Sequence, residues 1–404
     1  IDAKTDGEHQ ITINCKEPYF RNDLMLGGFK VVPRHFYDPE DLLAHISIAD
    51  LVDGSWAEGP QAEKAHRFAE RFNQDFSRAV LGSGPYQLLD PATDMVTQQK
   101  VVLTRDSDYW GRELGQLPQS GYVERIVFKI INNTDAAFIE LTNGDLDYLD
   151  LSSLEFKEKS WDPDFQASFM KAIRYRGGYT YIAWNNARPL FGDPRVRRAL
   201  TMLTDRQGMI DNLLFGLGEP VIGPIHKFRP EYNNNLEPYS YDPDTAIDLL
   251  YEAGWDDADE DGILDKQIDG ERIPFRFEIL VNSGNQLRKD IALVVQAELA
   301  DIGIDCQVRE LDWSIFLQRA DTQDFDALVL GWTGNVRFPP DAYQIWHSSQ
   351  AEGQGSNFIT FVNDEVDSIL EEYRREFDPD RRIALYQRFQ EILHEQQPYT
   401  FLWK

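Results

Sequence analysis

The chain has 404 residues, of which 42% are hydrophobic and 27% are charged, and its formal net charge is -29. A chain of this length and composition can bury a large core, and we expect it to form more than one domain. The strong negative charge repels phosphate backbones and argues against nucleic acid as a partner, whereas cationic or neutral solutes remain compatible with it. The sequence contains no run of 18 apolar residues, so we expect no membrane span.

The first 150 residues carry short strand and helix patterns. Strands are predicted near residues 10–20, 86–89, 100–104 and 125–131. Helices are predicted over residues 38–49 and 134–143, and the stretch at residues 62–76 is polar and amphipathic. Cys15 lies on the first of these strand-like runs and Cys306 on a distant one. Because nothing requires the two cysteines to pair, we expect two free, buried thiols.

The middle of the chain has the clearest local pattern. The aromatic and β-branched run at residues 179–184 predicts a strand. Asp193 is a favoured N-cap, and Pro194 follows at the first helical position, where its missing N–H is not needed. Apolar residues continue at helical spacing, with Asp205 able to cap a second segment and Gly216 ending it. We therefore predict a strand followed by a capped helix.

From residue 151 onward, strand and helix patterns alternate. Further strands are predicted over residues 275–281, 304–310, 325–332 and 399–403. Further helices are predicted over residues 244–253, 286–302, 313–320, 365–377 and 380–395. Alternation of this kind favours a largely parallel sheet that is covered by helices on both faces. We predict a first domain over residues 1–150, with a mixed sheet and few helices, and a second α/β domain over residues 151–404. Its mixed or largely parallel sheet is flanked by helices.

Five motifs occur in an order that resembles one known family. They are GSGPY at 82–86, LTNGDLD at 141–147, RVRRAL at 195–200 followed by TDRQ, NDEVD at 363–367, and QPYTF at 397–401. Each motif is weak by itself, but their order is specific. They resemble the extracytoplasmic solute-binding proteins of family 5, the peptide, dipeptide and nickel receptors of ABC importers.

The resemblance implies an architecture and a role. We expect a two-lobed α/β fold of the type II periplasmic-binding-protein kind, with a solute bound in the cleft between lobes and no catalysis. Measured against the family, we expect the first lobe to be incomplete, with an amino-terminal segment and the extreme carboxyl end missing. The last strand, 399–403, is expected near the hinge. The expected partners are a peptide or another small solute and the permease subunits. We expect the protein to be a monomer, located in the periplasm or attached to the cell surface as a lipoprotein.

The loop after the strand at 325–332 carries most of the candidate ligand-binding residues. They are Trp332, Thr333, Gly334, Asn335, Arg337 and Asp341. The loop leaves a strand end, where open α/β sheets present their crevice. Glycine permits a close backbone approach, and tryptophan supplies a wide apolar wall. The alternative is that Trp332 belongs to the core and Gly334 to a plain turn.

The resemblance adds further candidates. Trp313 matches a cleft tryptophan of the family, and Arg288 falls where some peptide receptors place a cation facing the ligand carboxylate, although a solvated helix position explains Arg288 equally well. Tyr181 and Asn185 are candidates near the end of the strand at 179–184, with packing as the alternative. Peptide receptors often place an aspartate at the position of Asn335. Either Asp341 takes over its contact with the ligand ammonium group, which we favour slightly, or the ligand is not a peptide with a free amino terminus.

An acidic loop resembles the first half of a calcium-binding loop. Asp257, Asp259, Asp261 and Asp265 occupy the positions of oxygen ligands, and a glycine stands at position 6. Ile268 stands where a bidentate glutamate is wanted. We therefore weigh weak calcium binding against a solvated turn.

Three rival functions follow from the sequence. A receptor for a non-peptide solute, such as a sugar or a nickel chelate, differs only in its ligand. A hydrolase is disfavoured because the sequence lacks the usual nucleophile and zinc motifs, although His347 precedes Ser348 and Ser349. A structural or chaperone-like interaction protein would bind no small ligand.

Overall fold

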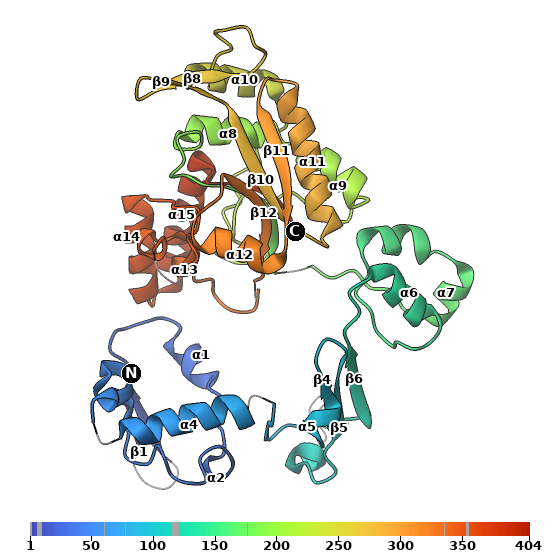
Figure 1. Cartoon of the computed structure of the whole chain (residues 1–404), viewed down its shortest axis with the longest axis vertical. Helices are drawn as coiled ribbons and strands as arrows, with labels where there is room; N and C mark the ends of the chain where they lie inside the picture. Colours follow the sequence, from blue (N-terminus) through green and yellow to red (C-terminus); the bar gives the residue numbers. More distant parts are fainter. Residues whose placement is uncertain are drawn as a thin grey trace. The chain divides into compact units, whose positions relative to one another are not determined.

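The computed structural model describes residues 2–5, 10–59, 61–76, 78–114, 121–175, 177–334, 336–352 and 355–404. These residues form two compact units, 1–150 and 151–404 (Figure 1). None of the helices in this described part of the chain has the length and apolar character needed to cross a bilayer.

The first unit begins with a hairpin and a group of helices. The antiparallel hairpin consists of β1 (Asp2–Thr5) and β2 (Ile11–Asn14). The helical segments that follow are α1 (Asn22–Gly27), α2 (Arg34–Tyr37), α3 (Ile48–Asp53), η1 (Ser55–Ala57) and α4 (Ala62–Asp75). Helix α4 coincides with the polar, amphipathic stretch at residues 62–76.

The single helix predicted over residues 38–49 is wrong. The Asp38 carboxylate accepts two backbone N–H groups of the turns that follow it, at 2.8 and 3.0 Å. Asp41 has a φ of 56°, a left-handed conformation that interrupts an α-helix. Helix α3 starts only after Ser47, whose side chain forms a capping box. Local side-chain bonds therefore replace the helix in this stretch.

The second part of this unit is a small antiparallel sheet. Strand β5 (Lys100–Arg105) pairs with β3 (Tyr86–Gln87), β4 (Met95–Val96) and β6 (Arg125–Lys129). The short helical segments beside it are α5 (Pro91–Asp94), η2 (Trp110–Leu114) and α6 (Thr134–Thr142).

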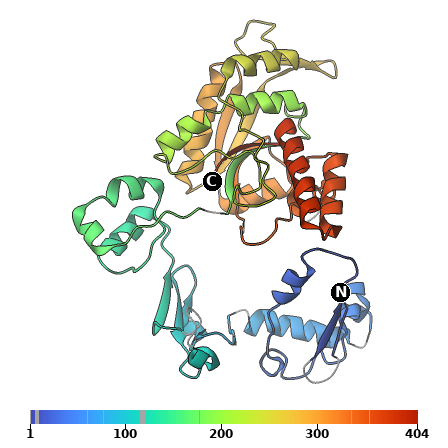
Figure 2. The same ribbon diagram turned by 180° about the vertical axis from the view of Figure 1, so that it is seen from behind.

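A five-stranded sheet forms the centre of the second unit (Figures 1 and 2). Its order is β11 (Asp305–Leu311), β10 (Arg276–Asn282), β12 (Ala327–Trp332), β7 (Tyr179–Trp184) and β13 (Tyr399–Trp403). The pairs β10–β11 and β10–β12 are parallel, whereas β7 is antiparallel to both of its neighbours. The sheet is therefore mixed, because β7 runs antiparallel to the other four strands.

One face of this sheet is covered by α8 (Pro194–Met202), α9 (Arg206–Leu213), α10 (Pro243–Glu252) and α11 (Gln286–Ala300). Their buried apolar side chains form one core with Ile182, Trp184, Val329 and Leu402 of the sheet. Because side chains alternate along a strand, every second residue of β7 faces this core. The indole Nε1 of Trp184 donates to Thr400 Oγ1 at 3.1 Å, which joins β7 to β13.

The other helices of the unit are α12 (Trp313–Asp321), α13 (Tyr343–Trp346), α14 (Asp364–Arg375) and α15 (Pro379–Gln396). The ring of Trp346 lies 4.8 Å from that of Tyr399 and 6.1 Å from that of Phe401. Tyr181 stacks on Tyr399, so this face of the sheet is aromatic. The remaining elements are η3 (Glu155–Lys159), α7 (Pro163–Ser168), the hairpin β8 (Asp265–Ile268) and β9 (Glu271–Pro274), and η4 (Ser348–Gln350).

The motif RVRRAL lies on α8 and has a structural explanation. Asp193 and Asp205 cap α8 and α9 through their side chains, as predicted. Arg197 is only 3% exposed and donates to the carbonyl oxygens of Phe191 at 2.6 Å and Gln396 at 3.0 Å. Burial lowers the pKa of Arg197 to about 10. This arginine therefore ties α8 to the end of α15 by bonds to main-chain carbonyl groups.

Candidate solute-binding surface

Most of the candidate residues lie at one edge of the five-stranded sheet. Strands β10 and β11 end side by side, since Asn282 and Leu311 are partners in the parallel register. Strand β12 ends at Trp332, which pairs with Tyr179 at the start of β7. Because ligands of open α/β sheets bind beyond the carboxyl ends of parallel strands, this edge is the expected place for a site.

Trp313 and Arg288 form one part of this edge. Helix α12 starts at Trp313, directly after β11, and 48% of this residue is exposed. The Arg288 guanidinium carbon lies 5.9 Å from the centre of the Trp313 ring, and Arg288 Nη1 donates to Asn282 Oδ1 at 2.6 Å. Burial lowers the pKa of Arg288, although arginine stays charged at neutral pH. The edge thus combines a flat apolar surface with a fixed positive charge.

Trp332 is half-buried and lies between two other rings of an aromatic stack. Its ring centre lies 6.3 Å from that of Tyr181 and 5.9 Å from that of Phe358, with nearly parallel planes in both cases. Tyr181 is fully buried and stacks in turn on Tyr399 at 4.1 Å. Trp332 is therefore held between Tyr181 and Phe358 and stays only partly accessible.

The loop after β12 begins with a close contact between two chain segments. Thr333 and Gly334 are exposed. A Cβ atom at Gly334 would overlap the carbonyl oxygen of Gly177, so glycine is needed here for the packing of the main chain. Asn335 lies outside the described residues. The predicted approach of a ligand to Gly334 stays a prediction.

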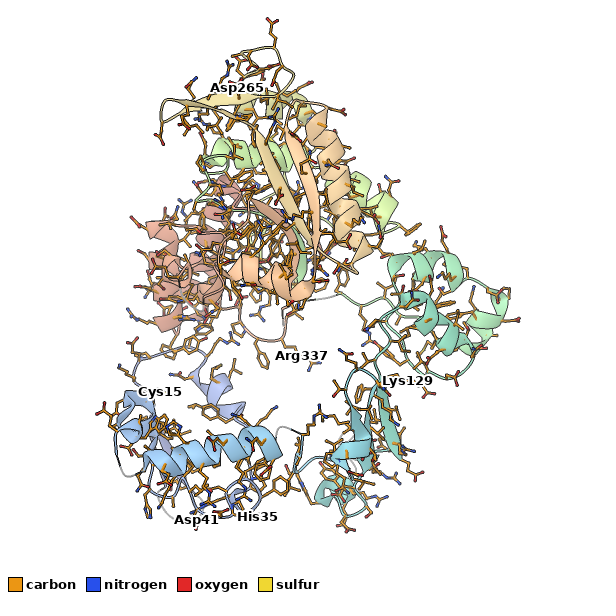
Figure 3. The ribbon with its side chains drawn as sticks, viewed as in Figure 1. Cys15, His35, Asp41, Lys129, Asp265 and Arg337 are labelled. Carbon is orange, nitrogen blue, oxygen red and sulfur yellow. The ribbon has the colours of Figure 1, made fainter. Side chains whose placement is uncertain are left out.

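Arg337 and Asp341 lie further along this loop and differ in their surroundings. Arg337 is exposed (Figure 3). The side chain of Asp341 is only 9% exposed, and Arg374 of α14 holds it: Arg374 Nε donates to the two carboxylate oxygens at 3.2 and 3.0 Å, and Nη2 lies 2.9 Å from Oδ2. The expectation that Asp341 pairs with a ligand ammonium group is therefore not supported, because Arg374 already balances its charge.

Asn185 lies at the opposite edge of the sheet. Because β7 runs antiparallel to β12, Trp184 pairs with Ala327, the first residue of β12. Asn185 is 2% exposed, and its Nδ2 donates to the carbonyl oxygens of Gln323 at 3.1 Å and Phe325 at 2.9 Å. The prediction that Asn185 belongs to the ligand surface is wrong. Its amide instead fixes the turn before β12.

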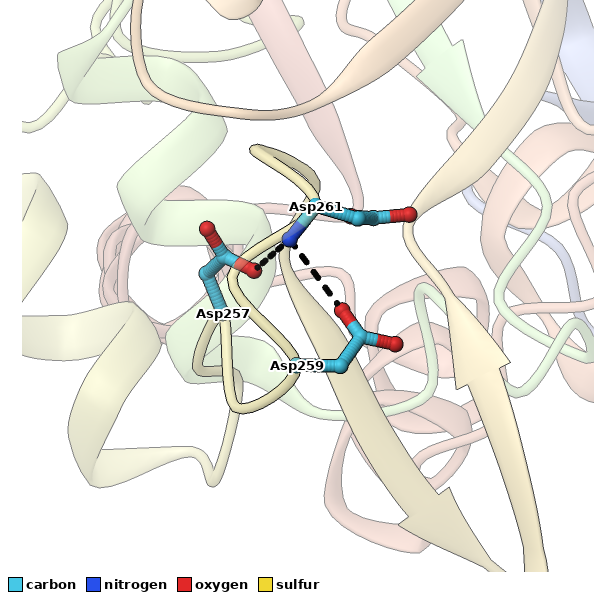
Figure 4. Close-up of side chains that lie close together, drawn as sticks. All are labelled: Asp257, Asp259 and Asp261. Atoms are coloured by element: carbon cyan, nitrogen blue, oxygen red, sulfur yellow. Dashed lines mark hydrogen bonds between the residues drawn. The ribbon is translucent and has the colours of Figure 1, made fainter.

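Three aspartates of the predicted calcium loop converge (Figure 4). One oxygen atom of each of Asp257, Asp259 and Asp261 lies within 4.8 Å of the others. Asp257 also accepts the backbone N–H of Asp261 at 3.0 Å. Calcium prefers about six to eight oxygen ligands, so these three groups fit a weak site completed by water. Calcium binding at this loop stays a prediction.

Asp265 does not belong to this group, and its prediction as a fourth calcium ligand is wrong. It is 8% exposed, and its Oδ1 lies 2.7 Å from Nε of Arg272. Asp265 starts β8 and faces Pro274 at the end of β9. The ion pair thus stabilises the hairpin, because it joins the two strands.

The residues considered for a hydrolytic dyad bond to other groups. His347 Nδ1 accepts the backbone N–H of Ser349 at 3.1 Å. The Ser348 hydroxyl donates to Asp367, and the Ser349 hydroxyl lies 3.3 Å from that of Tyr343. His347 is therefore arranged as the cap of a short helical turn, and this geometry does not favour a hydrolase.

The structure adds three residues that sequence reasoning missed. Tyr399 lies in the recognised motif QPYTF, but nothing in the motif shows that its ring supports Tyr181. Phe358 flanks Trp332 from a loop without regular pattern. Arg374 lies on the polar side of α14, where only the position of Asp341 in space reveals its role.

Comparison with known proteins places the chain in a family. The model of the bacterial extracellular solute-binding proteins, family 5 (middle region), matches residues 1–354. The chain therefore belongs to this family.

Two relatives and one solved structure are similar to this chain. It is 29% identical over 408 residues to oligopeptide-binding protein AppA of Bacillus subtilis, which covers 100% of this chain and 66% of AppA. It is 26% identical to heme-binding protein A of Haemophilus influenzae, over 80% of this chain and 54% of that protein. The structure of B. subtilis AppA in complex with a nonapeptide matches with a TM-score of 0.76 at 28% identity, covering 99% of this chain and 71% of that one. The predicted α/β fold of periplasmic binding proteins is confirmed, and the chain spans about half to two thirds of these two relatives.

Proposed function

We propose that this chain is part of the solute receptor of an ABC importer and that it binds a peptide-like solute at the strand-end surface. It then delivers the solute to the permease subunits and catalyses no reaction. Family membership supports this role. The receptor acts outside the cytoplasm, in the periplasm or as a lipoprotein at the cell surface, and it acts as a monomer.

The observation that carries the proposal is that Trp313, Arg288 and Trp332 lie at the same edge of the sheet. The three residues come from different elements, and the edge presents the exposed indole ring of Trp313, the half-buried ring of Trp332 and a positive charge. Indole faces pack against planar amide groups and side chains. A guanidinium group binds a carboxylate by charge-assisted hydrogen bonds. Peptides offer both kinds of group.

The named ligands of the relatives support a peptide but keep a second class open. AppA was solved with a nonapeptide, which favours peptides for this chain. The name of the H. influenzae relative indicates heme, which carries carboxylates on a flat apolar ring. We therefore retain a non-peptide solute, including a sugar or a nickel chelate, as the second candidate.

Binding measurements on the purified receptor test the proposal. Native mass spectrometry first shows whether a small molecule co-purifies and what mass it has. Fluorescence titration with a peptide mixture should then give saturable binding, and Trp313→Ala should weaken it about tenfold or more, corresponding to about 1.4 kcal/mol. Tyr251→Ala is the matched control, because this exposed aromatic residue lies on α10, away from the strand ends. Binding of sugars or metal chelates but not of peptides would favour the second candidate.

A further inference from the structure

The loop after β12 is fixed at its far end by one ion pair. Nε and Nη2 of Arg374 face the two carboxylate oxygens of Asp341, with three nitrogen–oxygen distances between 2.9 and 3.2 Å. The carboxylate is 9% exposed and the guanidinium 34%. Two parallel bonds of this kind fix the relative orientation of both groups, which a single bond does not.

The same pair is part of a larger packed group. Asp341 Oδ1 accepts the backbone N–H of Tyr343 at 3.1 Å. The Arg374 guanidinium carbon lies 3.8 Å from the centre of the Tyr343 ring, whose other neighbour is the ring of His347 at 4.1 Å. The next backbone N–H after Asp341 donates to the buried hydroxyl of Tyr386 at 2.8 Å. Residues 341–343 are therefore fastened to α14 and α15, whereas residues 336–338 are exposed.

We propose that Asp341 and Arg374 form a positioning pair that holds the loop after β12 against α14, and that Asp341 does not contact the solute. This inference rests on the proposed function, since it assigns the loop to the solute site. Its consequence for specificity is that the charge of a solute amino group is not recognised by Asp341. Instead, the loop presents its exposed part with Arg337 in a fixed place.

Hydrogen exchange on the ligand-free receptor tests the positioning role directly. Arg374→Gln and Asp341→Asn should each speed exchange over residues 336–347 by about tenfold or more, because either change breaks the pair. The double variant should be no faster than the single ones, since both act on the same bond. Arg374→Lys should be intermediate, because lysine keeps the charge but not the paired geometry. Arg381→Gln, which removes an exposed arginine paired with Glu372 and Glu376, should leave this segment unchanged. Unchanged exchange in both single variants overturns the proposal.

A pair of peptide probes tests whether Asp341 contacts the solute. The probes are a nonapeptide with a free amino group and its N-acetylated form. Asp341→Asn should change the affinity for both by the same factor, within about twofold, because a displaced loop affects both equally. A selective loss of about tenfold for the free-amine probe would show that Asp341 binds the ammonium group and would overturn the proposal. If the wild-type receptor binds neither probe, the peptide assignment fails, and hydrogen exchange still decides the positioning role.

Discussion

Tyr181 and Tyr399 stack almost face to face across neighbouring strands, with ring centres 4.1 Å apart and planes inclined by 13°. Both residues are fully buried, and among the described residues neither hydroxyl group forms a well-aligned hydrogen bond, although the two hydroxyl groups lie close enough to affect each other's pKa. Burial raises the pKa of both phenols well above their usual value. The stack therefore supports Trp332 through packing, whereas its poorly bonded hydroxyl groups destabilise the fold, because a buried polar group without a good hydrogen bond loses about 1–3 kcal/mol.

We therefore predict that Tyr181→Phe or Tyr399→Phe leaves the free energy of unfolding unchanged or raises it by up to about 1 kcal/mol. Tyr386→Phe is the control. Its hydroxyl accepts a backbone N–H, so its loss should destabilise the protein by about 1 kcal/mol or more. Urea unfolding measures all three. Destabilisation of the first two variants to the same extent as the control would show that their hydroxyl groups are bonded in solution.

Glu298 should make stability depend on pH. Burial is the main cause that raises the pKa of this carboxyl group to about 7, and the carboxylates of Asp205 and Asp301 add repulsion. In the unfolded chain the group ionises near its usual value, about 4.3. As the pH rises, Glu298 therefore loses its proton first in the unfolded state. Its contribution to the free energy of unfolding falls between about pH 4.5 and pH 7 and levels off above that range.

The variant Glu298→Gln isolates this contribution. The variant should have a higher free energy of unfolding than the wild type at pH 8. Because the side chain is partly exposed, the difference should be only on the order of 1 kcal/mol at pH 8 and close to zero at pH 4.5 or below. Urea unfolding of both proteins at the two pH values measures it. An equal gain at both pH values would contradict the assignment of this dependence to Glu298.

Calcium should bind weakly at the loop that contains Asp257, Asp259 and Asp261. Arg272 and Arg276 each approach one of these carboxylates to 3.9 Å, and their positive charge competes with a cation. We expect a dissociation constant of about 0.1–1 mM and a calcium-dependent rise in melting temperature. Asp259→Ala should abolish the rise, whereas the nearby control Asp269→Asn should keep it. A rise that persists in Asp259→Ala would count against this site.

The two thiols should differ in reactivity. Both cysteines are free, as predicted, but Cys306 is buried whereas Cys15 is only half-buried. Burial raises the pKa of Cys306 to about 12. Because the thiolate is the reactive form, a thiol reagent at pH 8 should label Cys15 in the folded protein and Cys306 only after unfolding. Mass spectrometry of the labelled protein measures both rates, and equal labelling of the two in the folded state would contradict the prediction.

Local signals made most elements of the second unit predictable. The cap at Asp193, for example, needs only the residues next to it, and the strand at 399–403 is marked by a run of aromatic residues. The direction of a strand relative to its neighbours, by contrast, is not determined by the local sequence. Nothing within residues 179–185 shows that β7 runs antiparallel to β12. This direction decides whether Tyr181 or Asn185 lies nearer to the sheet edge at which β10, β11 and β12 end.

The candidate site was predictable only where its residues follow a strand directly. Trp313 and Trp332 come immediately after β11 and at the end of β12, so their place follows from the strand pattern. The role of Asp341 depends on Arg374, which is 33 residues away in the chain. Propensity and spacing cannot indicate such a partner, because the contact exists only after α14 has packed beside the loop.

The pairing of β7 with β13 has a consequence for biosynthesis. Trp184 and Thr400 are hydrogen-bonded although they are 216 residues apart in the chain. At roughly 5–20 residues per second, the ribosome adds the partner of β7 on the order of 10–40 s after β7 itself. During this interval one edge of an apolar strand, including Tyr181 and Ile182, has no neighbour and can pair with other chains. The nascent chain should therefore depend on chaperones that hold it unfolded until synthesis reaches β13.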